Sequence, residues 1–335
     1  MLLSKLAAYL RENADSPQLH VVRQFESVEP ESGLLQAEPT FGQAEVVEGD
    51  GTLRSFSVCP SHTARFTHFV DGIQRTHVPV YMSHIPILYG YAGAAVRQRD
   101  EGRRMSTWES DSSEALYFPH NAIDPTSMKN SGISELYNTS YKIQKDKAEI
   151  PLHVLDAARK CLQERREELE IELAKRWADK VSGSSDCWLL VDGSLTGAHA
   201  LATNSRMIGL IKSHQTQYFK LEDQRKILSL QPGERSSVFE TLGARRTPVY
   251  TWYLRLHSNS GRDVYFGLVR VEAMKSKETV SQADEISSWL LAERAPLSLP
   301  DGRWDRMLYP IRDCEEYCRS LAPSRVAIEA ALAGL

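Results

Sequence analysis

The segment Cys187-Trp-Leu-Leu-Val-Asp192-Gly-Ser-Leu195 places an aspartate directly after a run of apolar residues. Such a run has the length and composition of a buried strand, so we expect Asp192 to be held at the edge of a sheet. A second segment, Arg65-Phe-Thr-His-Phe-Val-Asp71-Gly72, repeats the arrangement. If the fold brings Asp71 beside Asp192, their carboxylates form the kind of oxygen site that binds hard divalent cations.

Each aspartate also has a plainer interpretation. Asp-Gly after a strand is often only a turn, and for either aspartate alone a turn is the more common explanation. The two segments together, with an acidic helix between them, favour a site.

That helix is predicted to begin near Pro151, a residue suited to a first helical turn. Its apolar residues recur at helical spacing and are Leu155, Ala158, Leu162, Leu169, Leu173 and Trp177. The densely charged stretch that follows Leu162 supplies several glutamates. Glu170 flanks the apolar stripe and is the predicted third carboxylate, with Glu172 as the second choice.

The remaining elements are predicted from alternation, helical periodicity and turn residues. Before the helix we expect a hairpin over Phe41–Val58, strands at Phe66–Val70, His77–Met82 and Ile85–Ala92, and irregular structure over about 97–150. After it we expect the strands Trp188–Val191 and Met207–Ile211, a helix at Leu221–Leu230, a hairpin of Val249–Leu256 with Val264–Val271, a helix from about Val280, and two helical segments split by Pro323.

This order predicts an α/β fold. A strand that returns beside its predecessor after a helix is normally parallel to it, so the sheet should be mixed, with three antiparallel strands and then parallel ones. The same order occurs in the ribonuclease-H-like fold, here with an added hairpin and C-terminal helices. We therefore expect an N-terminal helix and hairpin extension over 1–60 and a ribonuclease-H-like domain over 61–335, with the irregular insertion inside it.

Further residues are candidates for binding a phosphate or a cation. Lys212 follows the strand Met207–Ile211 and would lie beside Asp192 if the two strands pair in parallel, where it could bind phosphate as a point charge; an ordinary strand-terminal lysine is the alternative. Arg270 and Glu272 are either an ion pair or a substrate clamp. The predicted DNA contacts are Arg75, Arg270 and Tyr309, and Glu315 is a further candidate metal ligand.

Composition narrows the class of protein. The chain has 335 residues and a net charge of −4, so it is not a generally basic nucleic-acid binder, although a local basic track suffices for an enzyme that acts on a polyanion. No apolar run of about 18 residues is present, and the N-terminus reads as an amphipathic helix rather than a signal peptide. The five cysteines form no CxxC pair, which is typical of reduced thiols and predicts a cytoplasmic protein. Phosphate-loop, dinucleotide, GxSxG and HExxH motifs are absent from the sequence.

With these motifs in place, the chain resembles the NurA nuclease family from about Phe66 to the C-terminus. The pieces that carry the resemblance are Val70-Asp71-Gly72, Arg166-Glu-Glu-Leu-Glu170-Ile-Glu-Leu-Ala174, Leu189-Leu-Val-Asp192-Gly-Ser-Leu195, Ile208-Gly-Leu-Ile-Lys212, Tyr253-Leu-Arg-Leu256, Gly267-Leu-Val-Arg-Val-Glu272 and Leu308-Tyr-Pro-Ile311. The resemblance implies a ribonuclease-H-like core related to the PIWI domain and a manganese-dependent DNA nuclease. It also implies a homodimer that works with HerA, a hexameric DNA-translocating ATPase, in DNA end processing, DNA repair or antiviral defence.

By the same resemblance, Asp71, Glu170 and Asp192 would hold Mn²⁺ or Mg²⁺. The sequence departs from the family pattern at two places: Ile73 replaces a small polar residue, and the position of a C-terminal histidine falls on Glu315. The second departure leaves open a catalytically weak or inactive subunit that guides DNA or docks the ATPase. A third interpretation is an unrelated α/β enzyme that uses the carboxylates as general acid and base, without a metal.

Overall fold

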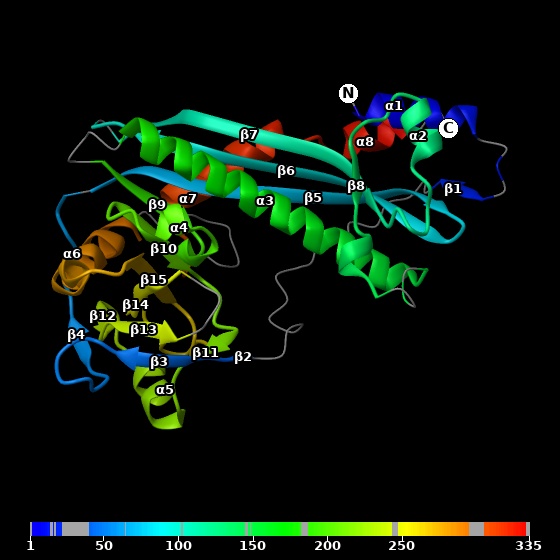
Figure 1. Ribbon diagram of the computed structural model, residues 1–335. Helices are drawn as coiled ribbons and strands as arrows, with labels where there is room; N and C mark the ends of the chain where they lie inside the picture. The colour runs from blue at the N-terminus through cyan, green and yellow to red at the C-terminus, as the bar shows by residue number, and fades with distance from the viewer. Residues whose placement is uncertain are drawn as a thin grey trace.

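One large mixed sheet organises the chain (Figure 1). The computed structural model describes residues 2–13, 16, 18–21, 40–63, 65–101, 103–144, 147, 149–181, 187–242, 247–294 and 305–332. Within these ranges thirteen strands join the sheet, and helices cover both of its faces. The expected α/β class is confirmed.

The centre of the sheet has the strand order β7-β6-β5-β9-β10. These strands are β5 (Phe66–Met82), β6 (Ile85–Arg99), β7 (Met105–Phe118), β9 (Trp188–Asp192) and β10 (Met207–Ile211). The first three form an antiparallel meander, whereas β9 runs parallel to β5 and β10 runs parallel to β9. The predicted change from antiparallel to parallel pairing is therefore present.

Antiparallel strands extend the sheet beyond β10 in the order β15-β14-β13-β3. Their bounds are β15 (Leu268–Met274), β14 (Val249–Arg255), β13 (Phe239–Leu242) and β3 (Gln43–Val46). Shorter strands are β1 (Leu19–Val21) beside β5, β8 (Leu136–Asn138) beside β7, and β4 (Ser55–Ser57) with β12 (Glu234–Ser236) near β14. A separate parallel pair consists of β2 (Thr40–Phe41) and β11 (Thr216–Gln217).

Two helices sandwich the meander. The 31-residue helix α3 (Pro151–Val181) crosses one face, and α7 (Tyr309–Leu321) lies against the other (Figure 1). Leu169 and Leu173 of α3 pack with Val70 of β5, whereas Ile311 and Cys314 of α7 pack with Phe69. Since successive strand residues face opposite sides of a sheet, the two helices pack against alternate residues of β5.

The other helices cover the flanks of the sheet. They are α1 (Leu2–Glu12), α2 (Thr126–Asn130), α4 (His199–Ala202), α5 (Leu221–Leu228), α6 (Lys277–Glu293) and α8 (Arg325–Leu332), with short 3-10 helices η1 (Ser140–Lys142) and η3 (Leu195–Gly197). The amphipathic N-terminal helix and the two C-terminal helices were predicted correctly, and α1 and α8 pack together beside the far end of β5 (Figure 1). In the described part of the chain, no helix is both long and apolar enough to cross a bilayer.

Four expectations about local structure were wrong. The separate strands Phe66–Val70 and His77–Met82 are one continuous strand, β5, so Asp71 lies inside a strand and not at its end. The supposedly irregular stretch from 97 contains the 14-residue strand β7. The predicted hairpin Phe41–Val58 does not form, because β3 pairs with β13 and β4 pairs with β12. The helix expected from about Val280 begins earlier, at Lys277, and its cap is Ser276, whose side chain accepts a hydrogen bond from the Thr279 amide.

Strands of the N-terminal segment join the main sheet. β1 pairs with β5, and β3 and β4 extend the sheet at its other side. The part of the expected 1–60 extension between 22 and 39 lies outside the described residues.

Candidate functional site

Asp71 and Asp192 lie on adjacent parallel strands. Val70 of β5 is paired with Val191 of β9, and each aspartate is the next residue along its strand. Both side chains face α7: Phe69, two residues before Asp71, and Leu190, two residues before Asp192, share the apolar cluster that contains the α7 residues. The two aspartates that the sequence placed after similar apolar runs are therefore neighbours on one face of the sheet.

β9 ends at Asp192, and the chain turns away from the sheet directly after it. Gly193 follows Asp192 with φ at 129°, a conformation that favours glycine, and its amide donates to the Leu210 carbonyl at 3.0 Å. The chain then leaves the sheet as η3. Because β5 continues for eleven residues beyond Asp71 to Met82, Asp71 lies beside the point where its neighbouring strand stops.

Asp71 is buried and incompletely hydrogen-bonded. The residue is 2% exposed. Its Oδ1 accepts from the Gly72 amide at 2.7 Å, whereas Oδ2 has no hydrogen-bond partner in the described part of the chain. Burial raises the pKa of Asp71 well above its usual value, and the neighbouring charge of Asp192 raises it further, against the opposing effect of Lys212. A buried carboxyl oxygen without a partner is costly in a folded protein and marks a place where a ligand can bind.

Lys212 contacts the second aspartate directly. Its Nζ lies 2.9 Å from Asp192 Oδ2 and 3.4 Å from Met307 Sδ. Arg306 Nη1 donates to the Lys212 carbonyl at 3.2 Å, which fixes the backbone at the end of β10. The parallel pairing of β9 with β10 thus puts Lys212 where the sequence predicted it.

Glu170 approaches from the opposite face of the sheet. It lies on α3 and is 8% exposed, whereas the side chain of the second choice, Glu172, is 48% exposed. A Cβ added to Gly72 would lie 2.5 Å from Glu170 Oε1, so the missing side chain of this glycine makes room for the carboxylate. The three acidic residues therefore reach β5 from two sides and do not converge on one face.

Charge around Glu170 is balanced by an arginine one helical turn earlier. Arg166 Nη1 donates to Glu170 Oε1 at 3.1 Å. Burial raises the pKa of Glu170 to about 7, Arg166 opposes the rise, and Asp192 adds to it. The charges of Glu170 and Asp192 thus oppose each other's ionisation although the two side chains lie on different faces of the sheet.

Glu315 is a further acidic residue near Asp71, supplied by α7. It is 6% exposed, and Arg319 Nη2 lies 3.5 Å from its Oε2. Its charge is among those that raise the pKa of Asp71. The candidate metal ligand Glu315 is thus a buried glutamate on the α7 side of the aspartate pair.

Three further contacts were predicted, at Arg270, Arg75 and Tyr309. Arg270 is buried and forms an ion pair with Glu272, with Nη1 2.7 Å from Oε1. Arg75 is half-buried on β5, four residues beyond Asp71. Tyr309 begins α7 and is 44% exposed. Of the basic residues on β6, Arg97 pairs with Asp313 and Arg99 pairs with Glu293, so these two stabilise the packing of helices on the sheet.

The carboxylate oxygens of the site are suitable ligands for a hard divalent cation, although they do not form a preformed coordination site. Carboxylate oxygens are the ligands that Mg²⁺ and Mn²⁺ prefer, and Asp71 Oδ2 accepts no hydrogen bond from the residues that the structure describes. No group of three or more histidine, cysteine, aspartate or glutamate side chains among the described residues is arranged to hold a metal ion. Binding there would require Lys212 to release Asp192, and Arg166 to release Glu170 if that residue is to take part.

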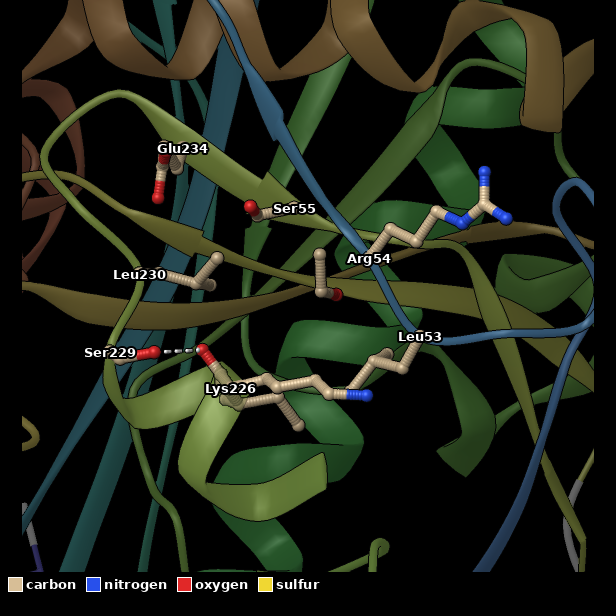
Figure 2. Close-up of a pocket in the computed structure, with 9 residues that line it drawn as sticks. Leu53, Arg54, Ser55, Lys226, Ser229, Leu230 and Glu234 are labelled. Carbon is tan, nitrogen blue, oxygen red and sulfur yellow. Dashed lines mark hydrogen bonds between the residues drawn. The ribbon is translucent and has the colours of Figure 1, made fainter. Parts of the chain in front are cut away.

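Two hollows in the surface lie away from these carboxylates. One, of about 140 Å³, lies between β4, β12 and the end of α5, and Figure 2 shows Ser55, Ser229, Leu230 and Glu234 around it. The other, of about 850 Å³, is lined by residues that include Phe41, Tyr218 and Leu242. Neither of these two hollows is lined by Asp71, Glu170 or Asp192.

Sequence reasoning missed two residues that shape the site. Arg166 was given no role, yet its position four residues before Glu170 is the spacing that lets two side chains of a helix pair. Glu272 was seen only as a partner of Arg270, and the sequence holds no signal for its contacts with the segment after Asp192.

Comparison with known proteins adds no further constraint. A scan of the chain against protein-family models finds no match, and a search of curated proteins finds none.

Proposed function

We propose that this protein is a metal-dependent DNA nuclease of the NurA type, in which Asp71 and Asp192 hold the divalent cations. The observation that carries the proposal is the adjacency of two aspartates on parallel strands, of which Asp71 is buried and its Oδ2 has no hydrogen-bond partner among the described residues. The strand order β7-β6-β5-β9-β10, with α3 between β7 and β9, supports a ribonuclease-H-like core.

The chemistry assigns each side chain a task. Bound Mn²⁺ or Mg²⁺ would neutralise phosphate charge and lower the pKa of an attacking water. Asp71 must lose its proton before it can act as a ligand. Lys212, displaced from Asp192, would bind a phosphate oxygen of the DNA, because its ammonium is already within reach of the same carboxylate. Glu170 and Glu315 would complete the acidic surroundings from α3 and α7.

Partners follow from the same proposal. We expect a homodimer that acts with a HerA-type ATPase hexamer, and DNA as the substrate. Arg75 and Tyr309, both partly exposed, are the proposed contacts for the DNA backbone and bases. Arg270, predicted from the sequence as a third DNA contact, is buried in an ion pair with Glu272 and is left out of this proposal.

A second candidate function is supported by the ion pair at Asp192. Because Lys212 already neutralises this aspartate, and no group of three ligands is arranged for a metal in the described residues, the same fold would also suit a non-catalytic subunit that guides DNA or docks the ATPase.

An endpoint assay separates the two. Purified protein is incubated with Mn²⁺ and end-labelled single- or double-stranded DNA, alone and with a HerA-type ATPase. We expect cleavage that EDTA stops. In Asp192→Asn the cleavage rate should fall by more than roughly 100-fold, because loss of even an outer-shell partner of a metal ligand lowers metal affinity or activity by about 10–100-fold. In Asp223→Asn, which removes a surface carboxylate of α5, the cleavage rate should be unchanged. DNA binding without cleavage under both conditions supports the non-catalytic subunit. Full activity of a folded Asp192→Asn protein refutes the nuclease assignment.

A further inference from the structure

Glu272 connects a neighbouring strand to the turn that follows Asp192. It lies on β15, is 1% exposed, and is paired in the sheet with Gly209 of β10. Its Oε2 accepts hydrogen bonds from Ser194 Oγ and from the Leu195 amide, each at 2.8 Å. The two donors come from residues that follow Asp192 and Gly193 directly, so this carboxylate anchors the chain at the exit of β9.

The contact is possible because Gly209 lies between the two partners. β10 separates β15 from β9, and a side chain on β10 at this position would block the way. A Cβ added to Gly209 would lie 2.7 Å from the Gly193 carbonyl oxygen and 3.1 Å from Leu195 Cγ. The glycine therefore allows the turn to fold down over the sheet and meet Glu272.

The second oxygen of Glu272 is held from its own strand. Arg270 Nη1 donates to Glu272 Oε1 at 2.7 Å and to Thr251 Oγ1 at 3.3 Å. The guanidinium also lies over the ring of Tyr218, 5.2 Å from its centroid. A buried charge is stable only when it is paired and hydrogen-bonded, and here each carboxylate oxygen has a separate, charged or polar partner.

We infer that Glu272 is a positioning residue for Asp192. The inference rests on the proposed metal-dependent function. The glycine at 193 gives the turn backbone freedom, and the turn has two anchors: the Gly193 amide on Leu210 at its start, and Glu272 at Ser194 and Leu195. Removal of the second anchor frees the residues next to Asp192, and a ligand that is not held in place binds its metal more weakly.

Glu272→Gln tests this role with little change in volume. Glutamine has one acceptor oxygen, so it cannot serve both Arg270 and the Ser194–Leu195 donors. The matched control is Glu293→Gln, because Glu293 is 5% exposed and pairs with Arg99 at the end of α6, without contact to the 192–195 turn. Ser194→Ala, which removes one donor and leaves the buried ion pair intact, serves as the milder variant if Glu272→Gln does not fold.

Two readouts are compared in the full-length chain. Hydrogen exchange of the peptide that spans 190–198 reports on the turn without any metal, and calorimetry with Mn²⁺ reports on affinity. We expect faster exchange in this peptide for Glu272→Gln and Ser194→Ala only, and for Glu272→Gln a Kd for Mn²⁺ about 10–100-fold weaker.

The possible outcomes distinguish the positioning role of Glu272 from the proposed metal-dependent function. If the wild type binds Mn²⁺ and Glu272→Gln binds it equally well, or if Glu293→Gln loses affinity to the same extent, the positioning role is overturned and the proposed function stands. If the wild type binds no Mn²⁺, the metal-dependent function is overturned, and with it the role of Glu272 in that function.

Discussion

Asp71 and Asp192 are each one residue beyond a paired valine, on parallel neighbouring strands, and their side chains share the face of the sheet that α7 covers. Burial raises the pKa of Asp71, and repulsion between the two neighbouring carboxylates raises it further. Arrangements that cost stability in this way are typical of functional sites, because a bound cation relieves the repulsion.

Asp71→Asn should leave the metal-free protein at least as stable as the wild type. Asparagine removes a carboxyl group whose pKa is raised by burial, so that its ionised form is costly, and it retains the acceptor for the Gly72 amide. The matched control is Asp305→Asn: Asp305 is 3% exposed and accepts from the Gly267 amide at 2.6 Å beside Arg306, so loss of its charge should destabilise the fold. Thermal unfolding in EDTA measures both variants. A large loss of stability in Asp71→Asn would show that this aspartate is structural.

Metal affinity and metal-free stability should change with pH in opposite directions. Folded Glu170 holds its proton up to about pH 7, whereas the unfolded chain releases it near its ordinary pKa of 4.5. Between these values the folded state binds more protons, so the free energy of unfolding falls as pH rises through this window; Asp71, with its raised pKa, acts in the same direction. Mn²⁺ binding, which needs ionised carboxylates, should strengthen over the same range.

Urea unfolding in EDTA at several pH values, beside Mn²⁺ titrations at the same values, checks this pH dependence. Glu170→Gln should show a weaker dependence in both measurements. A Glu170→Gln protein with the wild-type pH profile would mean that Glu170 does not titrate in this window.

Lys212→Met should separate metal binding from cleavage. The variant removes the ammonium that occupies Asp192 Oδ2, so Mn²⁺ affinity should rise, by about tenfold if the lost competition is worth about 1.4 kcal/mol. Cleavage at saturating Mn²⁺ should fall, because the proposed phosphate contact is lost. Lys275→Met, which breaks a surface pair with Glu240, is the control. Weaker Mn²⁺ binding in Lys212→Met would contradict the competition between lysine and metal.

Gly72→Ala should disturb the site from inside the sheet. The new methyl group would lie 2.5 Å from Glu170 Oε1 and 2.9 Å from the Gly93 carbonyl oxygen, so either the carboxylate or the strand must move. Overpacking of this kind costs about 1–3 kcal/mol. Gly90→Ala on β6 crowds Tyr117 and Leu162 without contact to Glu170, and should lose comparable stability while it keeps Mn²⁺ affinity. Equal Mn²⁺ affinities of Gly72→Ala and Gly90→Ala would show that Glu170 does not contribute to metal binding.

The sequence predicted those parts of the site that depend on local pattern. The apolar stripe of α3 located the helix and singled out Glu170, because a glutamate beside such a stripe is turned toward the core. The apolar runs before Asp192 and Lys212 located β9 and β10, and parallel pairing after a crossover brought their ends together.

Other parts depend on contacts far apart in the sequence. Asp71-Gly72 has the composition of a turn, yet β5 runs through it because β6 and β9 satisfy its backbone on both sides. The turn between β5 and β6 is at Ser83 and His84, which adopt φ values of 48° and 70°. Neither residue is a glycine, so the sequence gives no clear signal for this turn. β7 is rich in serine and acidic residues because it is partly exposed over much of its length. The approach of Glu170 from the other face of the sheet, and the link from Glu272 to the 193–195 turn, follow from packing and from two glycines that leave space.

Manganese anomalous scattering from crystals of the wild-type protein grown with Mn²⁺ tests the central claim most directly. We predict an anomalous peak within coordination distance of both Asp71 Oδ2 and Asp192, with Lys212 Nζ moved away from the aspartate. The claim would be contradicted by a structure that holds fully occupied Mn²⁺ at other sites, while Lys212 remains on Asp192 and Asp71 Oδ2 contacts no ion.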